Sequence, residues 1–315
     1  MPFVTAFYRA LGTGMVISVD SPIDDKVRSA MESLIEDYEH VLSRFRNDSL
    51  IAAIGKAEHG GSFDFPDWCA PLFDLYDALF SATSGAIDPC VGEDLIRLGY
   101  DASLSFTVTQ DAPEHLGALR GRAVWGRDVT RHGTTLVTHE PMQLDFGACG
   151  KGYLVDLLGR MLQSSQFVID AGGDLLIHAE QPISVALEDP EDQSHAIGIA
   201  HIANGALCAS APSRRHWNVA VNERTQIAIH HLLNAIDGLP AQQTEASWAY
   251  IPANATLNLA RDYPTAVADG LATALFVSDV AQLQRTFDFT YATLDESRQI
   301  AVSRNFPAEL FLRSA

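Results

Sequence analysis

Strand-like segments follow one another between residues 167 and 210, and no helical pattern separates them. Each is short, mostly apolar or β-branched, and bounded by glycine, proline or polar residues, which is the usual signature of a β-strand. Helices therefore do not alternate regularly with strands, as they would in βαβ units, and the pattern favours an α+β fold. The predicted strands are residues 167–170, 175–177, 183–187, 196–202 and 205–210.

Helical patterns lie on both sides of this strand-rich region. We predict a first helix in which Ser21 is the N-cap and Pro22 the first helical residue, with an apolar stripe from Val27 to Phe45. No repeat or linker interrupts the chain, so we expect a single domain over residues 1–315. Other predicted elements are two strands within 3–20, a helix over 72–80 that ends at Ser84-Gly85, helices at about 153–163 and 263–277, and short strands after 287.

Charge and composition exclude several classes of protein. The 315 residues include 21 Lys+Arg and 40 Asp+Glu, which gives a formal net charge of −19. A nucleic-acid-binding protein normally presents a basic face, so we expect no nucleic-acid partner. No apolar run approaches the ~20 residues of a spanning helix, so no transmembrane segment is expected. No leader pattern opens the sequence, and the four scattered cysteines form no CxxC pair; both observations favour a cytoplasmic protein.

The segment LDFGACGKGYLVD (144–156) combines a strand end, three glycines, a lysine and the start of a helix. Glycines let a backbone approach a ligand closely, and amides at a helix N-terminus attract anions. Lys151 would add a positive charge suited to a phosphate. The spacing differs from that of a Walker A motif. From these residues alone, a phosphate site and a plain strand-to-helix turn with a surface lysine are equally good interpretations.

Asp269 and Thr273 are four residues apart in a helical segment, so they share one face of that helix. Their neighbours are small and apolar, and a carboxylate in such surroundings needs a partner. Carboxylate and hydroxyl oxygens suit a hard cation such as Mg²⁺. The plainer alternative is a capping role for Asp269 and a back-bonded hydroxyl for Thr273.

Two further segments carry groups that suit a reactive site. His230 and His231 are adjacent, so their side chains would point to opposite faces of a strand, and one of them is a candidate general base. Asp88 precedes a proline, which favours an extended backbone and would aim its carboxylate at a ligand or only form a turn. No zinc motif and no GxSxG motif is present.

Taken in this order, these segments resemble the ApbE family of FAD:protein FMN transferases. The most specific pieces are LDFGACGKGYLVD (144–156) and AVADGLATALFV (266–277). The resemblance extends from about residue 11 to 278 and implies ApbE-like, T-fold-related antiparallel sheets with flanking helices. Supporting pieces are LGTGMVISV (11–19), LSRFRNDSLIAAI (42–54), SGAIDPCVG (84–92), DAGGDLLI (170–177) and HLLNAIDGLP (231–240).

The resemblance implies an enzyme that transfers the FMN half of FAD, through its phosphate, to a Thr or Ser of a target flavoprotein and releases AMP. It implies Mg²⁺, with Mn²⁺ as the other candidate, held by Asp269, Thr273 and the backbone carbonyl of Ala148. His231 would be the catalytic base, with Asp269 as the second catalytic residue. The residues expected to contact FAD are Leu11, Phe45, Ala86, Ile87, Asp88, Asp145, Lys151 and Leu232.

Some positions depart from the family pattern. The family's H-I-I-D-P-x-T-G is replaced by His231-Leu-Leu-Asn-Ala-Ile-Asp-Gly, and its A-T-S-G-D-Y by Cys208-Ala-Ser-Ala-Pro-Ser. The metal pair and Lys151 are intact. Two other functions therefore stay open beside the transferase: a Mg²⁺-dependent FAD pyrophosphatase that uses water in place of the acceptor, and a non-catalytic FAD-binding or flavin-delivery protein.

Overall fold

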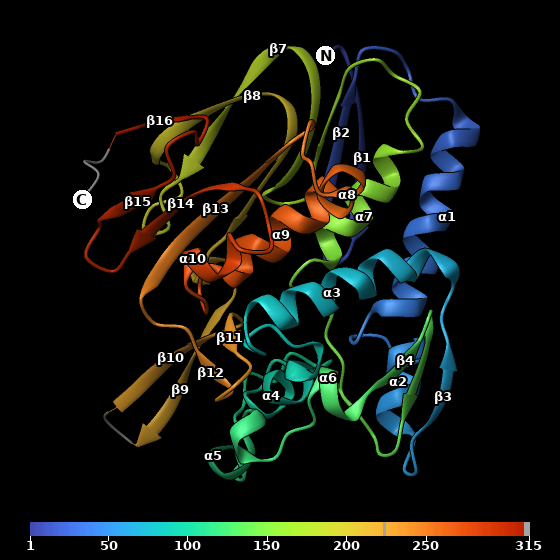
Figure 1. Ribbon diagram of the computed structural model, residues 1–315, viewed down its shortest axis with the longest axis vertical. Helices are drawn as coiled ribbons and strands as arrows, with labels where there is room; N and C mark the ends of the chain where they lie inside the picture. Colours follow the sequence, from blue (N-terminus) through green and yellow to red (C-terminus); the bar gives the residue numbers. More distant parts are fainter. Residues whose placement is uncertain (223–224, 312–315) are drawn as a thin grey trace.

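A nine-stranded sheet is the centre of the fold in the computed structural model, which describes residues 1–222 and 225–311 (Figure 1). Every strand pairing in this sheet is antiparallel, which with the flanking helices confirms the α+β prediction. In order across the sheet the strands are β1 (Phe3–Ala10), β2 (Thr13–Val19), β6 (Phe167–Asp170), β7 (Asp174–Glu188), β8 (Ala196–Ser210), β13 (Thr244–Pro252), β14 (Thr290–Asp295) and β15 (Ile300–Val302), with β16 (Ala308–Leu310) beside β8.

Two adjacent helices, α7 (Gly150–Gly159) and α9 (Pro264–Ala274), pack against β7, β8 and β13. The longer helices α1 (Asp25–Leu42) and α3 (Ala70–Ala82) lie beside and below them in Figure 1. No helix among the described residues has the length and apolar content that a membrane crossing requires. The remaining helices are α2 (Leu50–Lys56), α4 (Gly92–Arg97), α5 (Ala112–His115), α6 (Trp125–Asp128), α8 (Asn258–Asp262) and α10 (Val280–Leu283), with 3-10 turns η1 (Asp67–Cys69), η2 (Pro89–Val91), η3 (Ala118–Arg120) and η4 (Pro212–Arg214).

Three small sheets complete the fold, all outside the nine-stranded sheet. A three-stranded sheet places β5 between β3 and β4, and two hairpins pair β9 with β10 and β11 with β12. The 101–140 region therefore contains only short elements: α5, η3, α6, β4 and β5. The bounds are β3 (Gly61–Asp64), β4 (Thr130–His132), β5 (Thr135–Thr138), β9 (His216–Asn222), β10 (Thr225–His230), β11 (Leu233–Asn234) and β12 (Leu239–Pro240).

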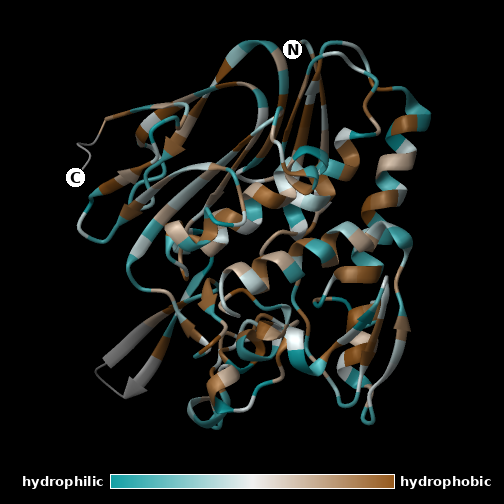
Figure 2. Ribbon diagram, in the orientation of Figure 1, coloured by the Kyte–Doolittle hydropathy of each residue, from teal (hydrophilic) through white to brown (hydrophobic). Residues whose placement is uncertain are grey.

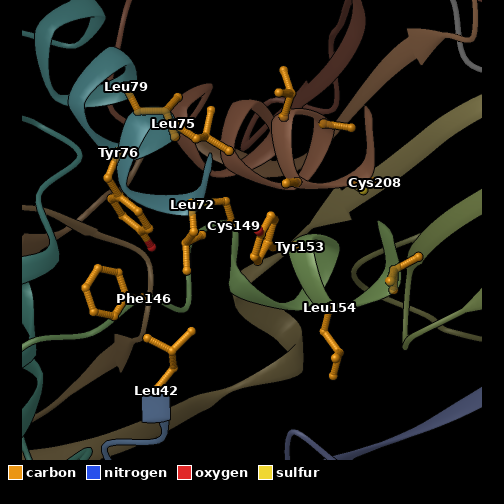
Figure 3. Packing of buried hydrophobic residues seen from close by; sticks show 14 of the residues in the cluster. Leu42, Leu72, Leu75, Tyr76, Leu79, Phe146, Cys149, Tyr153, Leu154 and Cys208 are labelled. Carbon is orange, nitrogen blue, oxygen red and sulfur yellow. The ribbon is translucent and has the colours of Figure 1, made fainter. Parts of the chain in front are cut away.

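The main hydrophobic core lies where α1, α3, α7 and α9 meet the sheet. Figure 3 shows side chains of α3, among them Leu72 and Tyr76, pointing toward Phe146 and Cys149 in the segment that leads into α7. Alternating hydrophilic and hydrophobic bands along α1 mark it as amphipathic in Figure 2, with Met31 and Ile35 on its buried face. Side chains of β7, β8, β13, β14 and β15 form a second core cluster.

The first helix begins later than predicted. Asp24, not Ser21, is its N-cap: its carboxylate accepts a hydrogen bond from the Lys26 amide at 2.7 Å, and Pro22 precedes the helix. The helix also ends at Leu42. Beyond its end, the Arg44 guanidinium lies over the Tyr100 ring and Phe45 packs edge-on against that ring.

The second predicted helix is confirmed as α3. It ends before Gly85, whose φ of +88° is in the left-handed region that favours glycine and whose amide bonds back to the Phe80 carbonyl at 2.8 Å.

The predicted strand 167–170 is confirmed, but the next four predicted strands form only two. Segments 175–177 and 183–187 both lie in β7, and 196–202 and 205–210 both lie in β8. The two long strands stay paired across the expected breaks, with an irregularity between His178 and Ile183. The helix predicted at 153–163 begins three residues earlier as α7, and the helix predicted at 263–277 is α9, which ends at Ala274.

Candidate functional site

Helices α7 and α9 are held together by one glycine and one buried carboxylate. A Cβ on Gly152 would lie 2.3 Å from the Thr265 carbonyl oxygen, so only glycine permits this approach. The Asp156 carboxylate accepts hydrogen bonds from the amides of Thr265 at 3.0 Å and Ala266 at 2.8 Å, which satisfies the first turn of α9. Burial raises the pKa of Asp156 to about 7. This contact fixes Lys151 on α7 relative to Asp269 on α9.

Three charged side chains meet at this helix pair. The Lys151 ammonium is paired with Asp174, at the start of β7, and lies 3.6 Å from Oδ1 of Asp269. The other Asp269 oxygen accepts from the Gly152 amide at 3.0 Å. Burial, with the nearby Asp174 charge, raises the pKa of Asp269 to about 8. Burial acts to lower the pKa of Lys151, but its two carboxylate neighbours outweigh burial and raise that pKa.

Two of the three groups expected to hold a cation, Thr273 and Ala148, are in contact, and the third, Asp269, is on the same helix as Thr273. Thr273 is one turn after Asp269, and its hydroxyl oxygen is 3.4 Å from the Ala148 carbonyl oxygen and 3.5 Å from Oγ of Ser210. Within residues 1–222 and 225–311, no group of three or more His, Cys, Asp or Glu side chains is placed to bind a metal. The donor set is therefore one carboxylate and neutral oxygens, which fits an ion such as Mg²⁺ that takes its other ligands from water and phosphates.

Arg44 holds the predicted contact residue Asp145 in place. Its Nε donates to one Asp145 oxygen, and its Nη1 donates to the Tyr100 carbonyl at 2.6 Å. The other Asp145 oxygen accepts from the Gly147 amide at 2.6 Å. The Arg44 guanidinium also lies 4.2 Å from the ring centroid of Phe45, a ring that is 40% exposed. Phe45 therefore offers an open aromatic face, whereas the Asp145 carboxylate is already engaged.

The adjacent histidines contact different segments, as their neighbouring positions predicted. Nδ1 of His231 is 3.2 Å from the Arg215 carbonyl, whereas Nε2 of His230 is 2.7 Å from the Ala241 carbonyl. Burial lowers the pKa of His231 to about 4, and the positive charge of Lys151 acts in the same direction. His231 is therefore neutral near pH 7 and able to accept a proton.

The Asp88 carboxylate points into the protein, where protein groups already engage it. It accepts from the amides of Cys90 at 2.8 Å and Trp125 at 3.3 Å, and it lies 3.6 Å from Nη1 of the buried Arg122. Asp88 is extended before Pro89, and its side chain caps the 3-10 turn η2. This is the turn-forming role that the sequence left open as an alternative. The side chains of the nearby predicted contacts are also buried: Ala86, Ile87 and Leu232.

Leu11 lies in the β1–β2 turn with a φ of +54°, an uncommon conformation for a branched residue. Its amide donates to Oε1 of Glu39 at 2.9 Å, which holds the turn against α1. The turn is close to the β6–β7 turn, because a Cβ on Gly172 would lie 3.7 Å from Oγ1 of Thr13. Leu11 is thus at the same end of the sheet as Asp174.

Sequence reasoning assigned no role to Asp174, Arg44 or Arg215. Asp174 follows the Gly172-Gly173 turn in the supporting segment DAGGDLLI (170–177), and its carboxylate is the partner of Lys151. The signal for Asp174 was its place directly after two glycines. Arg44 and Arg215 carried no signal of their own, because their partners lie 101 and 115 positions away.

Comparison with known proteins points to the same family as the sequence motifs do. A curated relative from Klebsiella pneumoniae (strain 342), named FAD:protein FMN transferase, is 23% identical over 274 residues, which cover 83% of this chain and 74% of the relative. A relative of the same name from Treponema pallidum (strain Nichols) is 27% identical over 286 residues, which cover 80% of this chain and 72% of the relative.

Solved structures share the fold. The ApbE protein of Thermotoga maritima superposes with a TM-score of 0.78 at 19% identity, over 98% of this chain and 99% of that chain. The flavin transferase ApbE of Vibrio cholerae gives a TM-score of 0.76 at 18% identity, over 96% and 97% of the two chains. The family model described as ApbE family matches residues 11–293, and this chain therefore belongs to the ApbE family.

Proposed function

We propose that this protein is an FAD:protein FMN transferase. In the proposed reaction, the hydroxyl oxygen of an acceptor Thr or Ser attacks the phosphorus of the FMN half of FAD. A phosphoester bond forms, the bond between that phosphorus and the bridging oxygen of the pyrophosphate breaks, and AMP leaves with the bridging oxygen. The observation that carries the proposal is the meeting of Lys151, Asp269 and Thr273 at the contact of α7 and α9 in a chain of the ApbE family.

Asp269, the Thr273 hydroxyl and the Ala148 carbonyl would hold Mg²⁺, with Mn²⁺ as the other candidate. When bound, the cation would neutralise charge on the pyrophosphate, the main need of phosphoryl transfer. Lys151 supplies a second positive charge, fixed in position by Asp174. Because the pKa of Asp269 is raised to about 8, a proton competes with the cation, and we expect tighter cation binding as pH rises.

His231 is the proposed base for the acceptor hydroxyl. It is neutral at physiological pH because burial lowers its pKa to about 4, so its free ring nitrogen accepts the proton that the hydroxyl loses. FAD would lie against Phe45 and Leu11, with backbone contacts from the buried 86–88 segment, Leu232 and Asp145. The single domain and the cytoplasmic location stay predictions from the sequence.

The experiment that tests the proposal is nucleotide and peptide analysis after incubation with FAD and Mg²⁺. An acceptor peptide with a Thr or Ser between small residues is present in one sample and absent from the other. FMN mass on the peptide together with AMP supports the transferase. AMP and free FMN without the peptide would instead show a pyrophosphatase. Bound FAD with no AMP in either sample would show a flavin-delivery protein and overturn the proposal.

A further inference from the structure

Arg215 is a half-buried cation that no acidic side chain of the described residues pairs with. Its Nη1 donates to the Tyr100 hydroxyl, and no carboxylate among the described residues lies within 4.0 Å of it. The neighbouring Arg214 differs: its side chain is 53% exposed and its Nη2 is 2.7 Å from Oε2 of Glu188. Two consecutive arginines thus have different surroundings: within residues 1–222 and 225–311, a carboxylate balances the charge of Arg214 but not that of Arg215.

A second guanidinium lies on the same tyrosine. The guanidinium carbon of Arg44 is 4.6 Å from the Tyr100 ring centroid, and that of Arg215 is 5.7 Å from it. Arg44 is 7% exposed, and its Nη2 is buried with no hydrogen-bond partner among the described residues. Asp145 is the only carboxylate paired with either group in the described chain. The two guanidinium groups therefore have one carboxylate, that of Asp145, between them in a partly buried environment.

The arginine pair borders the candidate site on two sides. The Arg215 carbonyl is 3.2 Å from Nδ1 of His231, and Asp145, the partner of Arg44, begins the loop that leads to Ala148. The open ring of Phe45 packs edge-on against Tyr100, with ring centroids 5.4 Å apart. An aromatic face beside an excess of positive charge suits a ligand that carries both a planar ring and a phosphate.

We propose that Arg215, supported by Arg44, forms an anion subsite for a nucleotide phosphate, separate from the cation ligands on α9. The proposal rests on the proposed function, in which that nucleotide is FAD. The guanidinium fork of Arg215 takes phosphate oxygens in a charge-assisted contact, and Arg44 fixes Tyr100 beneath it. The phosphate then supplies the negative charge that the described residues lack.

The test is FAD affinity, measured by fluorescence titration in EDTA, so that cation binding does not contribute. The variants are Arg215→Gln, Arg215→Lys and the matched control Arg214→Gln. Because Arg215→Gln removes a charged hydrogen-bond partner, we expect its dissociation constant for FAD to rise by about 10-fold or more. The constant for Arg215→Lys should lie between those of wild type and Arg215→Gln. Because Arg214 is exposed, Arg214→Gln should change the dissociation constant for FAD by no more than about 2-fold. Riboflavin, which has no phosphate, should bind wild type and Arg215→Gln equally.

Two outcomes would overturn the subsite. One is FAD affinity in Arg215→Gln equal to that in Arg214→Gln; the other is an equal loss of riboflavin affinity, which would assign Arg215 to the ring pocket. Thermal melting of each variant separates these outcomes from loss of the fold. If the wild-type protein binds FAD but transfers no FMN, the proposed function is wrong and the subsite proposal stands. If the wild-type protein binds no FAD, both proposals are wrong.

Discussion

At the scale of single residues, the candidate site depends on a balance of buried charge. Lys151 lies between two carboxylates, and one of them, Asp174, is fully buried. A buried carboxylate that loses its only cation is costly, because neither water nor a counter-charge then stabilises it. The lysine therefore has a structural role in the free protein as well as its proposed role toward phosphate.

The variant Lys151→Met should lower the free energy of unfolding by about 3–5 kcal/mol, because Asp174 is left without a partner. The double variant with Asp174→Asn should recover most of that loss. Urea denaturation measures both, and Lys26→Met, at an exposed position in α1, is the control. A double variant no more stable than Lys151→Met would show that Asp174 is not the group that Lys151 compensates.

Single residues were also where sequence reasoning had its clearest limits. Motifs predicted Lys151 as a phosphate contact and placed Asp269 and Thr273 on one helix face. In the structure Lys151 lies 3.6 Å from Asp269, and Thr273, one turn later, lies beside the Ala148 carbonyl. Asp88 also lay in a motif, but its carboxylate turns inward, to the amides of Cys90 and Trp125 and toward Arg122, and no local pattern links Trp125 or Arg122 to it. A motif gives the kind of group at a position; distant partners decide which way that group points.

At the scale of secondary-structure elements, the contact between α7 and α9 sets the geometry of the site. The sequence predicted both helices, but it placed the start of α7 after its glycines, since glycine is usually a poor helix former. In the structure Gly150 and Gly152 are helical, and the close approach of α9 explains Gly152. Strand β13, at the middle of the sheet, was not predicted, and β7 and β8 were each predicted as two pieces, because pairing with neighbours sustains strands that local patterns do not.

Gly152→Ala should destabilise the protein by about 1–3 kcal/mol, since the new Cβ would force α7 and α9 apart. The same shift would move the Gly152 amide away from Asp269 and weaken Mg²⁺ binding. Gly14→Ala is the control, because a Cβ there meets no atom within 4 Å. Chemical denaturation and a Mg²⁺ titration are the measurements, and equal stability of the two variants would contradict the proposed close contact.

The raised pKa of Asp156, which joins α7 to α9, makes the stability of the protein depend on pH. Its pKa is raised from an ordinary value near 3.8 to about 7, so the folded state holds the proton more tightly than the unfolded chain. The stability that this group contributes is present at low pH and is lost as pH rises toward 7. We expect wild type to lose stability relative to Asp156→Asn between pH 5 and pH 8, by an amount on the order of 1 kcal/mol or more. Urea denaturation at both pH values tests this, and a constant difference would contradict it.

At the scale of the whole molecule, ligands of the candidate site should stabilise the fold. A ligand present at about 100 times its dissociation constant adds about 2.7 kcal/mol to the free energy of unfolding. FAD with Mg²⁺ should therefore raise the melting temperature more than FAD with EDTA. Asp269→Asn should remove only the Mg²⁺-dependent part, whereas Asp262→Asn, at an exposed position on α8, should keep it. An Mg²⁺ effect that persists in Asp269→Asn would place the cation elsewhere.

The long strands β7 and β8 both have one end at the candidate site, through Asp174 and Ser210, and meet again at the exposed turn around residues 190–194. At about 3.3 Å per residue, the length of chain along β7 from Asp174 to that turn is on the order of 45 Å. A fluorophore or a surface tether attached there would follow the molecule without entering the flavin site. The hairpin thus offers a position for single-molecule observation of an acceptor protein as it arrives and departs.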